Sequence, residues 1–370
     1  MTCKPEFLPA RGLSPILVLG LVLLLVVLLT ACSGPGYYLQ AISGQWKLMH
    51  AREDIQSLLH DPDTKPDLIT QLEAASRILA FAETTLGMPA NGSYSSYVEL
   101  DDGALVWNVV ATEEFSLEPK QWCFVFIGCL PYRGFFKQQA AEKSLAKLHS
   151  KGMDVYLAAA PAYSTLGKFK DPLLSSMFTG SDIGIAAFLF HELAHQRLYI
   201  KGDGQFNESY ASFIEAAGVQ IWLQSSGRQT ELNQWQKMRN AGADFNLLIA
   251  DTRNELEEVY RSDISPVEKR AMKAATIERL VLSYDQLRVD QWEGENYYSG
   301  WFSEPINNAK LALYTTYEGS QCAFQKLFDD AAGNLLEFHR LAEQQSRIAK
   351  DQRDKWLMQS CAAIASTGKL

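Results

Sequence analysis

The residues best suited to chemistry lie in the stretch FLFHELAHQRLYIKGDGQFNESYASF, which covers positions 188–213. His191 and His195 are four residues apart, so on a helix their imidazoles project from one face, one turn from each other. This spacing allows both rings to bind one metal ion, while Glu192 lies beside the metal and can take a proton from a metal-bound water. The preceding residues IGIAAFLF are apolar, and a buried helix suits a catalytic metal. The pattern predicts a zinc-binding catalytic helix, in preference to a core helix that carries two histidines.

A catalytic zinc ion needs a third protein ligand and one position for water. If the helix continues about six residues past His195, roughly 9 Å, the segment GDGQF must turn the chain back. Asn207 is then expected to cap a second helix, with Glu208 in its first turn at the level of His195. Glu215, two turns further on, would overshoot by roughly 10 Å. We therefore predict one Zn²⁺ ion bound by His191, His195 and Glu208, with Glu215 as the alternative third ligand.

Two resemblances agree with this interpretation. HELAH followed by NESYA resembles the gluzincin metallopeptidases, in which HExxH is followed by a glutamate on a second helix, although the gap of twelve residues between His195 and Glu208 is shorter than in their best-known members. Over most of the chain, the sequence is similar to a bacterial family named as aminopeptidases. The shared stretches are WCFVFIGCLPYRGFF, AYSTLGKFKDPLL, HELAHQRLYIKGDGQFNESYASF and NNAKLALYTTY. The resemblance implies a zinc metallopeptidase, and it supports that class more strongly than exopeptidase activity.

Two further roles around the metal need polar side chains. Hydrogen bonds from neighbouring groups should orient the imidazoles, and Asp203 and Ser212 are the candidates nearest in sequence. The oxyanion that forms during peptide hydrolysis needs a donor besides the metal. Tyrosines in the family-like stretches can supply this donor, and we expect Tyr317 or Tyr163 to be the catalytic residue that does so.

The elements that position the site differ between the two halves of the chain. Helical spacing of apolar residues is found at 37–58, 66–86 and 136–150. Period-two spacing predicts strands in YSSYVEL, ALVWNVVAT, WCFVFIG and MDVYLAAAPAY, and the first two are expected to form a hairpin through residues 101–103. Beyond residue 204 nearly everything is helical, with breaks near 225–227, 262–266, 293–305 and Gly333.

The predicted fold class is therefore α+β and mostly helical. It combines a small mixed β-sheet in the N-terminal half with a zincin-type active-site helix and an all-helical C-terminal half. We expect residues 1–31 to be a lipoprotein signal peptide and residues 32–370 to form a single metallopeptidase domain. Within that domain, residues 32–180 supply helices and the small sheet, residues 181–224 the metal-binding helix pair, and residues 225–370 the helical half.

The N-terminus resembles a bacterial lipoprotein signal. Lys4 and Arg11 precede an apolar run from Leu13 to Leu29, and the residues TAC follow, ending at Cys32. Cleavage before Cys32 would leave its thiol to carry the lipid. An uncleaved transmembrane anchor is the alternative, because this run is near the lower limit for crossing ~30 Å of hydrocarbon. Since Ser33 rather than aspartate follows the cysteine, we expect lipid anchoring in the bacterial cell envelope, at the outer membrane and facing the periplasm.

Four cysteines remain beyond position 32, and an even number in an oxidising compartment permits disulfides. Cys123 and Cys129 are close enough in sequence to pair around a tight bend. Cys322 and Cys361 would join two C-terminal helices. Free buried cysteines are the alternative, whereas a zinc ribbon is not favoured because neither pair has the short gap of a metal knuckle.

The predicted function is zinc-dependent peptide hydrolysis, with aminopeptidase as the family-based expectation. Glu215 and Glu318 are candidates to bind the substrate's free ammonium. The expected partners are a peptide substrate and the membrane, reached through the N-terminal lipid. Nucleic acid is not expected, since the net charge is −9 and no basic run is present. The alternatives are a periplasmic metal-dependent amidase acting on cell-wall peptides and a non-enzymatic lipoprotein with a structural zinc site. Glu192 argues against the second, because a structural site needs no base.

Overall fold

The computed structural model describes residues 35–89, 91–100, 104–124, 128–160, 165, 170–178, 180–316 and 321–367. The predicted signal peptide (1–31), the predicted lipidation site Cys32 and the candidates Tyr163, Tyr317 and Glu318 lie outside the described residues. Of the helices within the described ranges, none combines the length and the apolar character needed to cross a bilayer.

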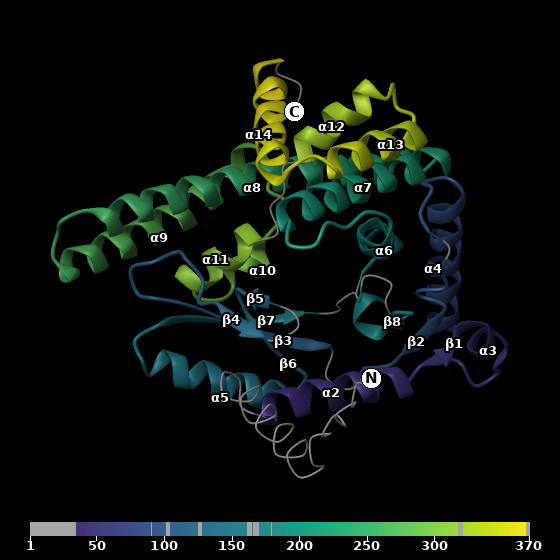
Figure 1. Ribbon diagram of the computed structural model, residues 1–370, viewed down its shortest axis with the longest axis horizontal. Coiled ribbons are helices and arrows are strands. Elements are labelled where there is room, and N and C mark those ends of the chain that lie inside the picture. Colours follow the sequence, from purple (N-terminus) through teal and green to yellow (C-terminus); the bar gives the residue numbers. More distant parts are fainter. Residues whose placement is uncertain are drawn as a thin grey trace, which may run out of the picture.

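Helices make up most of the structure, and the small sheets lie in the N-terminal half, which confirms the predicted α+β class (Figure 1). The helices are α2 (Pro35–His50), α3 (Ile55–His60), α4 (Pro66–Thr84), α5 (Gln138–His149), the 3₁₀ turn η1 (Ser175–Phe178), α6 (Asp182–Arg197), α7 (Gly204–Ser225), α8 (Gln229–Arg261), α9 (Pro266–Asp290), α10 (Ser299–Phe302), α11 (Asn308–Thr316), α12 (Gln321–Asp330), α13 (Leu335–Ser346) and α14 (Lys350–Thr367). The strands are β1 (Glu53–Asp54), β2 (Ser96–Val98), β3 (Val106–Thr112), β4 (Trp122–Phe124), β5 (Gly128–Leu130), β6 (Arg133–Phe135), β7 (Asp154–Ala160) and β8 (Leu173–Leu174).

Within the described residues, the strands form three small sheets where one mixed sheet was expected. Their strand orders are β1-β2-β8, β6-β3-β7 and β4-β5. The predicted hairpin between YSSYVEL and ALVWNVVAT is wrong, because β2 and β3 belong to different sheets. β2 instead pairs in parallel with β8, where Tyr97 lies opposite Leu173. Period-two spacing identifies a strand, but the partner of β2 lies far along the chain and leaves no local signal.

The β6-β3-β7 sheet lies between a helix below it and the helical half above it (Figure 1). α5 packs on one face through a core that includes Val109 and Leu148. α11 contacts β3 and β7 as well. Asn307 caps α11 by accepting from the Lys310 amide at 3.0 Å, and it also donates to the Val155 carbonyl of β7 at 2.9 Å. This sheet therefore connects the N-terminal half to α11.

α6 is buried on most sides because its own residues are largely apolar, including Leu189 and Phe190, which are both fully buried. It packs against α4 and, most extensively, against α7. Gly218 of α7 leaves no room for a side chain, since a Cβ atom there would lie 2.8 Å from carbon atoms of Leu86 and Phe190. Glycine is needed where a backbone approaches other atoms this closely, because it has no Cβ atom. The glycine thus keeps α7 tight against α6.

Helices α12, α13 and α14 lie next to α7 in the upper part of Figure 1, where α14 stands nearly upright against it. The contact includes a polar group, because His339 of α13 is fully buried. Tyr210 of α7 donates to its Nδ1 at 2.8 Å, and its Nε2 donates to the Leu86 carbonyl at 2.9 Å. One neutral imidazole satisfies both hydrogen bonds, so this histidine is suited to burial only while it is uncharged.

α8 and α9 form a long helical pair that extends to one side of the molecule (Figure 1). α9 starts with a capping box, in which the Ser265 hydroxyl accepts from the Glu268 amide and the Glu268 carboxylate accepts from the Ser265 amide. The predicted breaks are found where expected: α7 ends at Ser225, α8 ends at Arg261, and Gly333 separates α12 from α13 with a φ of +76°.

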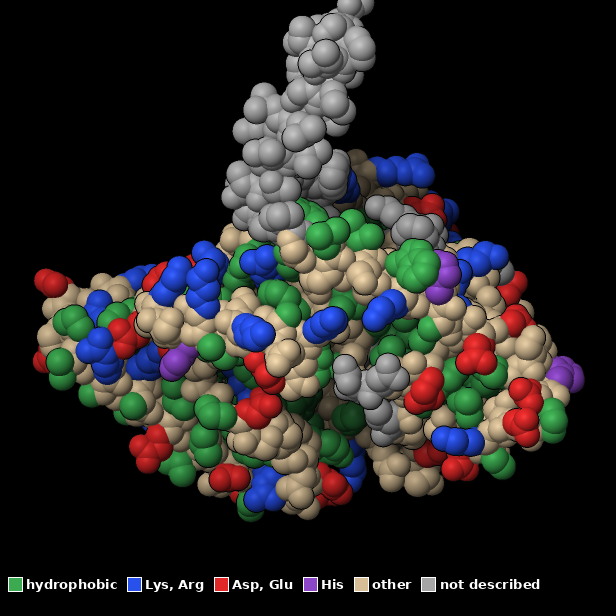
Figure 2. Space-filling view, turned by 90° about the horizontal axis from the view of Figure 1, so that it is seen from below, with side chains coloured by type: hydrophobic (Ala, Val, Ile, Leu, Met, Phe, Trp, Pro, Cys, Tyr) green, Lys and Arg blue, Asp and Glu red, His purple; other side chains and the backbone are tan. Residues whose placement is uncertain are grey.

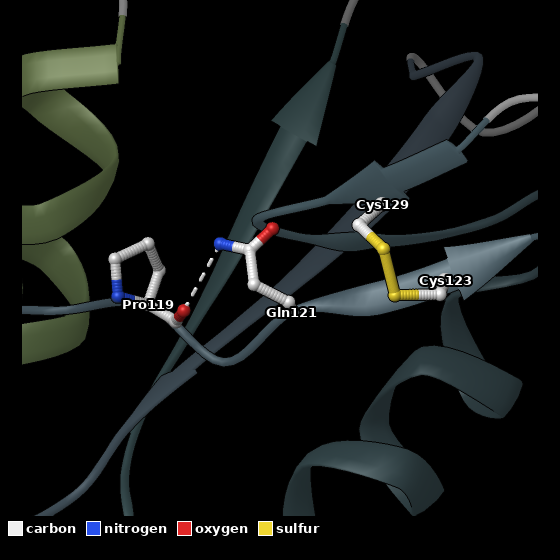
Figure 3. Close-up of a disulfide and its surroundings, with 4 residues drawn as sticks. All are labelled: Pro119, Gln121, Cys123 and Cys129. Atoms are coloured by element: carbon white, nitrogen blue, oxygen red, sulfur yellow. Dashed lines mark hydrogen bonds between the residues drawn. A yellow bond between two sulfur atoms is a disulfide. The ribbon is translucent and has the colours of Figure 1, made fainter.

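The predicted disulfide between Cys123 and Cys129 is present (Figure 3). The two cysteines face each other across the β4-β5 pair, with Cα atoms 3.8 Å apart. Gln121 donates to the Pro119 carbonyl at 3.2 Å just before β4. Cys322 is also disulfide-bonded, and the predicted partner Cys361 lies outside the side chains that the structure describes.

Candidate metal centre

His191, Glu192 and His195 all lie in the C-terminal half of α6. Asp182, in the first turn of this helix, accepts two hydrogen bonds from Arg228 at 2.8 and 2.9 Å, which tie the helix start to the start of α8. A carboxylate at this end also interacts favourably with the helix dipole. The helix holds the two imidazole rings with centroids 4.8 Å apart and planes at 82°.

The turn between α6 and α7 is built differently from the prediction. α6 ends at Arg197 and α7 begins at Gly204, so Asn207 lies inside α7 and is not its N-cap. Its amide group instead donates to the Ile200 carbonyl and accepts from the Ile200 amide, both at 2.8 Å. Asn207 therefore stabilises the turn between α6 and α7 through these two hydrogen bonds to the backbone of Ile200.

Asp203 is the N-cap of α7, where its carboxylate accepts from the Phe206 amide at 3.3 Å. The same carboxylate is ion-paired with Arg353 of α14 at 2.7 Å. Its described contacts are thus with α7 and α14, and none of these contacts is with His191 or His195. Ser212 is buried one turn after Glu208, and the contacts described for it include no hydrogen bond to either histidine.

Glu208 meets both imidazoles. Its Oε2 lies 3.4 Å from His191 Nε2, its Oε1 lies 3.5 Å from His195 Nε2, and the two Nε2 atoms are 3.2 Å apart. Tetrahedral zinc with bonds of about 2.0–2.1 Å has neighbouring ligand atoms about 3.4 Å apart. The three donor groups are therefore spaced as the ligands of one small metal ion, and they form the cluster that could hold a metal among the described residues.

The donor chemistry fits a metal as well as the spacing does. Two neutral imidazole nitrogens and one carboxylate form a set that binds zinc. His195 is buried, and its Nδ1 has no hydrogen-bond partner among the described atoms. If Nδ1 carries the proton, the lone pair of Nε2 is left facing the donor group, as metal binding requires.

Glu215 lies behind His191, on the side away from Glu208. Its Oε2 is 3.1 Å from His191 Nδ1, and its Oε1 is 3.7 Å from Arg239 Nη1. A carboxylate in this position accepts a hydrogen bond from Nδ1–H, which keeps the proton on Nδ1 and leaves Nε2 unprotonated and directed toward the metal position. Glu215, predicted as the alternative third ligand, thus contacts the outer nitrogen of a ligand candidate, while Glu208 contacts the inner nitrogens.

The electrostatics of the cluster favour a positive charge. Burial lowers the pKa of His191, but the hydrogen bonds that its ring donates to the Glu208 and Glu215 carboxylates outweigh burial and raise the pKa to about 10. For Glu208, burial raises the pKa, but hydrogen bonds from the two histidines outweigh it and lower the pKa to about 2. The carboxylates that hold a proton on His191 would equally favour a metal cation between these side chains.

Sequence reasoning missed two arginines that support the site. Arg239 of α8 lies near Glu215 and also donates to Gln321 of α12 at 2.5 Å. Arg353 of α14 holds the Asp203 cap from a position 150 residues further along the chain. Neither arginine belongs to a local motif, so only the folded chain shows these contacts.

A family model described as "Putative aminopeptidase" matches residues 36–357. The chain belongs to this family. The match runs from the first turn of α2 into α14, so it includes every element that builds the metal centre. No curated protein and no solved structure matches the chain. Membership of this family supports peptidase activity in general.

Proposed function

We propose that this chain is a zinc-dependent peptidase with aminopeptidase activity, in which Glu192 is the general base. The observation that carries the proposal is the spacing of the three donor groups of His191, His195 and Glu208, at 3.2–3.5 Å from one another. A structural zinc site is normally closed by four protein ligands, whereas a catalytic site has three and a place for water. The described residues around this position supply three.

When bound, a zinc ion would lower the pKa of a coordinated water and polarise the scissile carbonyl. The side chains of the chain carry the remaining roles. His191, His195 and Glu208 would hold the ion, and Glu215 would keep His191 in the tautomer that binds it. This division assigns a separate task to each of the two glutamates of α7.

Glu192 follows His191 directly on α6, so its carboxylate projects beside the donor face of the helix. From there it would take a proton from the attacking water and deliver it to the leaving amine. The developing oxyanion would need a further hydrogen-bond donor, for which Tyr317 and Tyr163 remain our candidates. Preference for a free N-terminus rests on the family description.

We further propose that the mature protein is attached to the outer membrane through lipid on Cys32 and faces the periplasm. The order of basic residues, apolar run and cysteine in the sequence supports this. Mass spectrometry of the mature N-terminus tests it directly. A diacylated fragment beginning at Cys32 is expected, and an intact N-terminus would refute cleavage.

The decisive comparison is between the wild type and Glu192→Gln, with Glu73→Gln as a matched control. Glu73 is an exposed glutamate of α4. We expect all three proteins to bind about one zinc ion per chain, and kcat/KM of Glu192→Gln for peptides to fall by at least about 10²-fold. Loss of zinc from Glu192→Gln, or equal hydrolysis by all three proteins, would refute the proposed role.

Substrate class is measured in the same assay. Free and N-acetylated forms of one peptide separate an aminopeptidase from an endopeptidase, because only the free form carries the ammonium group. Cell-wall peptide fragments form a third arm. Cleavage confined to those fragments would favour the amidase alternative over the peptidase.

A further inference from the structure

The outer face of α2 is apolar although it is exposed to solvent. Leu39, Ile42 and Trp46 are 66%, 65% and 60% exposed, and their spacing places them along one side of the helix. The opposite side packs inward, where Leu48 is buried and the Tyr37 ring stacks on Phe124 with centroids 5.2 Å apart. A helix on the surface of a globular protein normally presents polar residues outward. This helix is apolar on both sides.

The charged residues of α2 and α5 are mainly positive, although the whole chain carries a net charge of −9 and the exposed Glu53 and Asp54 follow α2 closely. Residues 35–52 include Lys47 and Arg52 and no acidic residue. Residues 137–151, which include α5, carry four exposed lysines and one glutamate. The two helices lie together below the β6-β3-β7 sheet (Figure 1). Figure 2 shows this face from below, with a row of Lys and Arg side chains across its middle and acidic side chains below that row and on both flanks.

A cavity lies beside α2 and reaches the residue before α5, and Glu99 is the acidic residue in its lining. It has a volume of about 380 Å³ and is lined by Lys47 of α2, by Lys137 just before α5, and by apolar side chains that include Phe136. Lys47 is on the exposed side of α2, next to Trp46. Positive charge and exposed apolar surface therefore meet on one face. That combination complements an anionic phospholipid surface, where Trp and Lys are favoured at the boundary of the headgroups.

The position of α2 in the chain points to the same partner. α2 begins at Pro35, three residues after Cys32 and six after the end of the apolar run at Leu29. Three extended residues span at most about 11 Å. Either form of N-terminal anchor would thus hold the first turn of α2 at the membrane, so this step depends on the membrane attachment proposed above.

We propose that the outer face of α2 lies on an anionic phospholipid bilayer. Leu39, Ile42 and Trp46 insert at the boundary of headgroups and acyl chains, and the lysines around α5 face the anionic headgroups. The contact gives the anchored protein a fixed orientation, with α5 and the β6-β3-β7 sheet nearest the membrane and α7 on the far side of that sheet (Figure 1).

The test uses the full chain in vesicles of phosphatidylethanolamine with a minor fraction of phosphatidylglycerol. A benzophenone amino acid is introduced at Ile42 or, as a matched control, at Leu336 of α13, which is 72% exposed. After illumination, cross-linking to phospholipid is measured by mass spectrometry. We expect a cross-link at Ile42 and little at Leu336.

A charge-reversal pair separates the proposed contact from mere closeness to the anchor. Lys143→Glu with Lys147→Glu reverses two exposed lysines of α5, and Lys201→Glu with Lys355→Glu makes the same change in net charge elsewhere. Each lysine near an anionic surface contributes about fivefold to binding. The α5 pair should therefore lower the Ile42 cross-link by about tenfold or more, and the control pair should leave it unchanged.

The outcomes separate the membrane face of α2 from the N-terminal anchor. Equal cross-linking at Ile42 and Leu336, or equal effects of the two charge-reversal pairs, overturns the membrane face while the anchor stands. If the full chain does not float with vesicles, both the anchor and the membrane face fail. Neither result bears on zinc binding or on peptide hydrolysis, which the Glu192→Gln comparison tests separately.

Discussion

Replacing Glu215 by glutamine tests how the metal centre is held. Glu215 accepts a hydrogen bond from His191 Nδ1, with the two atoms 3.1 Å apart. Glutamine keeps the length of the side chain and one acceptor oxygen but removes the negative charge. The substitution should therefore weaken the orientation of His191 without removing a metal ligand. The matching substitution Glu208→Gln should remove a ligand.

The two substitutions differ in expected size. Loss of a group that supports a ligating histidine typically costs 10–100-fold in metal affinity, or about 1.4–2.7 kcal/mol. Zinc binding worth about 10–16 kcal/mol, divided equally among three protein ligands and a water, assigns about 2.5–4 kcal/mol to one ligand. Glu208→Gln should then raise the dissociation constant more than about a hundredfold. We expect zinc affinity to fall in the order wild type, Glu215→Gln, Glu208→Gln.

The assay is competition for zinc between the protein and a chromophoric chelator at neutral pH, with circular dichroism to show that each variant is folded. Glu73→Gln is the control and should bind zinc like the wild type. With zinc in excess, Glu215→Gln should regain most of its hydrolytic rate, because the catalytic groups are still present.

Two results would refute this reasoning. If Glu215→Gln binds zinc more weakly than Glu208→Gln, then Glu215 is the third ligand and the assigned roles are reversed. If Glu215→Gln binds zinc as tightly as the wild type, the hydrogen bond to His191 has no part in holding the site.

Three further predictions concern stability. Arg353→Met leaves the buried Asp203 carboxylate with only the more distant Lys350, at 3.9 Å, to balance its charge. Denaturant titration should show a loss of about 3 kcal/mol in the free energy of unfolding, and an unchanged midpoint would contradict the role of the pair. Gly218→Ala places a methyl group 2.8 Å from two buried side-chain carbons, and thermal unfolding should show a cost of about 1–3 kcal/mol, against no loss if α7 can move away from α6. Burial lowers the folded-state pKa of His339 to about 4. The unfolded chain therefore takes up a proton at higher pH than the folded one, so the contribution of His339 to the free energy of unfolding is full above pH ~6.5 and falls by about 3 kcal/mol toward pH 4. The stability difference between wild type and His339→Gln should shrink as pH falls through this window. A constant difference would show that His339 is not the source of the pH dependence.

The helix that carries the donors could be predicted because its signal is local. His191 and His195 share a helix face by spacing alone, and the short turn that follows brings Glu208 to the same level. The role of Glu215 could not be predicted in the same way. α7 runs back along α6, so Glu215 lies beyond the level of His195. That position brings its carboxylate to the Nδ1 side of His191.

Contacts between residues far apart in the chain could not be predicted from local sequence patterns either. The pattern in β2 predicted a strand, but its pairing with Leu173 depends on residues far along the chain. The N-cap of α7 shows the same limit. Asn207 has a suitable side chain for capping, yet Asp203 takes that position, where Arg353 can neutralise its buried charge. Local patterns thus identified the helices and the donors, and the long-range contacts determined what supports them.

The ion pair between Asp203 and Arg353 also affects when the site can form during synthesis. The donors are complete once Glu208 has been made, but the arginine that holds the start of their second helix is 150 residues downstream of the aspartate. We therefore expect the metal centre to become rigid late, after most of the polypeptide has been synthesised. Tight metal capture would then follow folding, and an incomplete chain would hold zinc weakly.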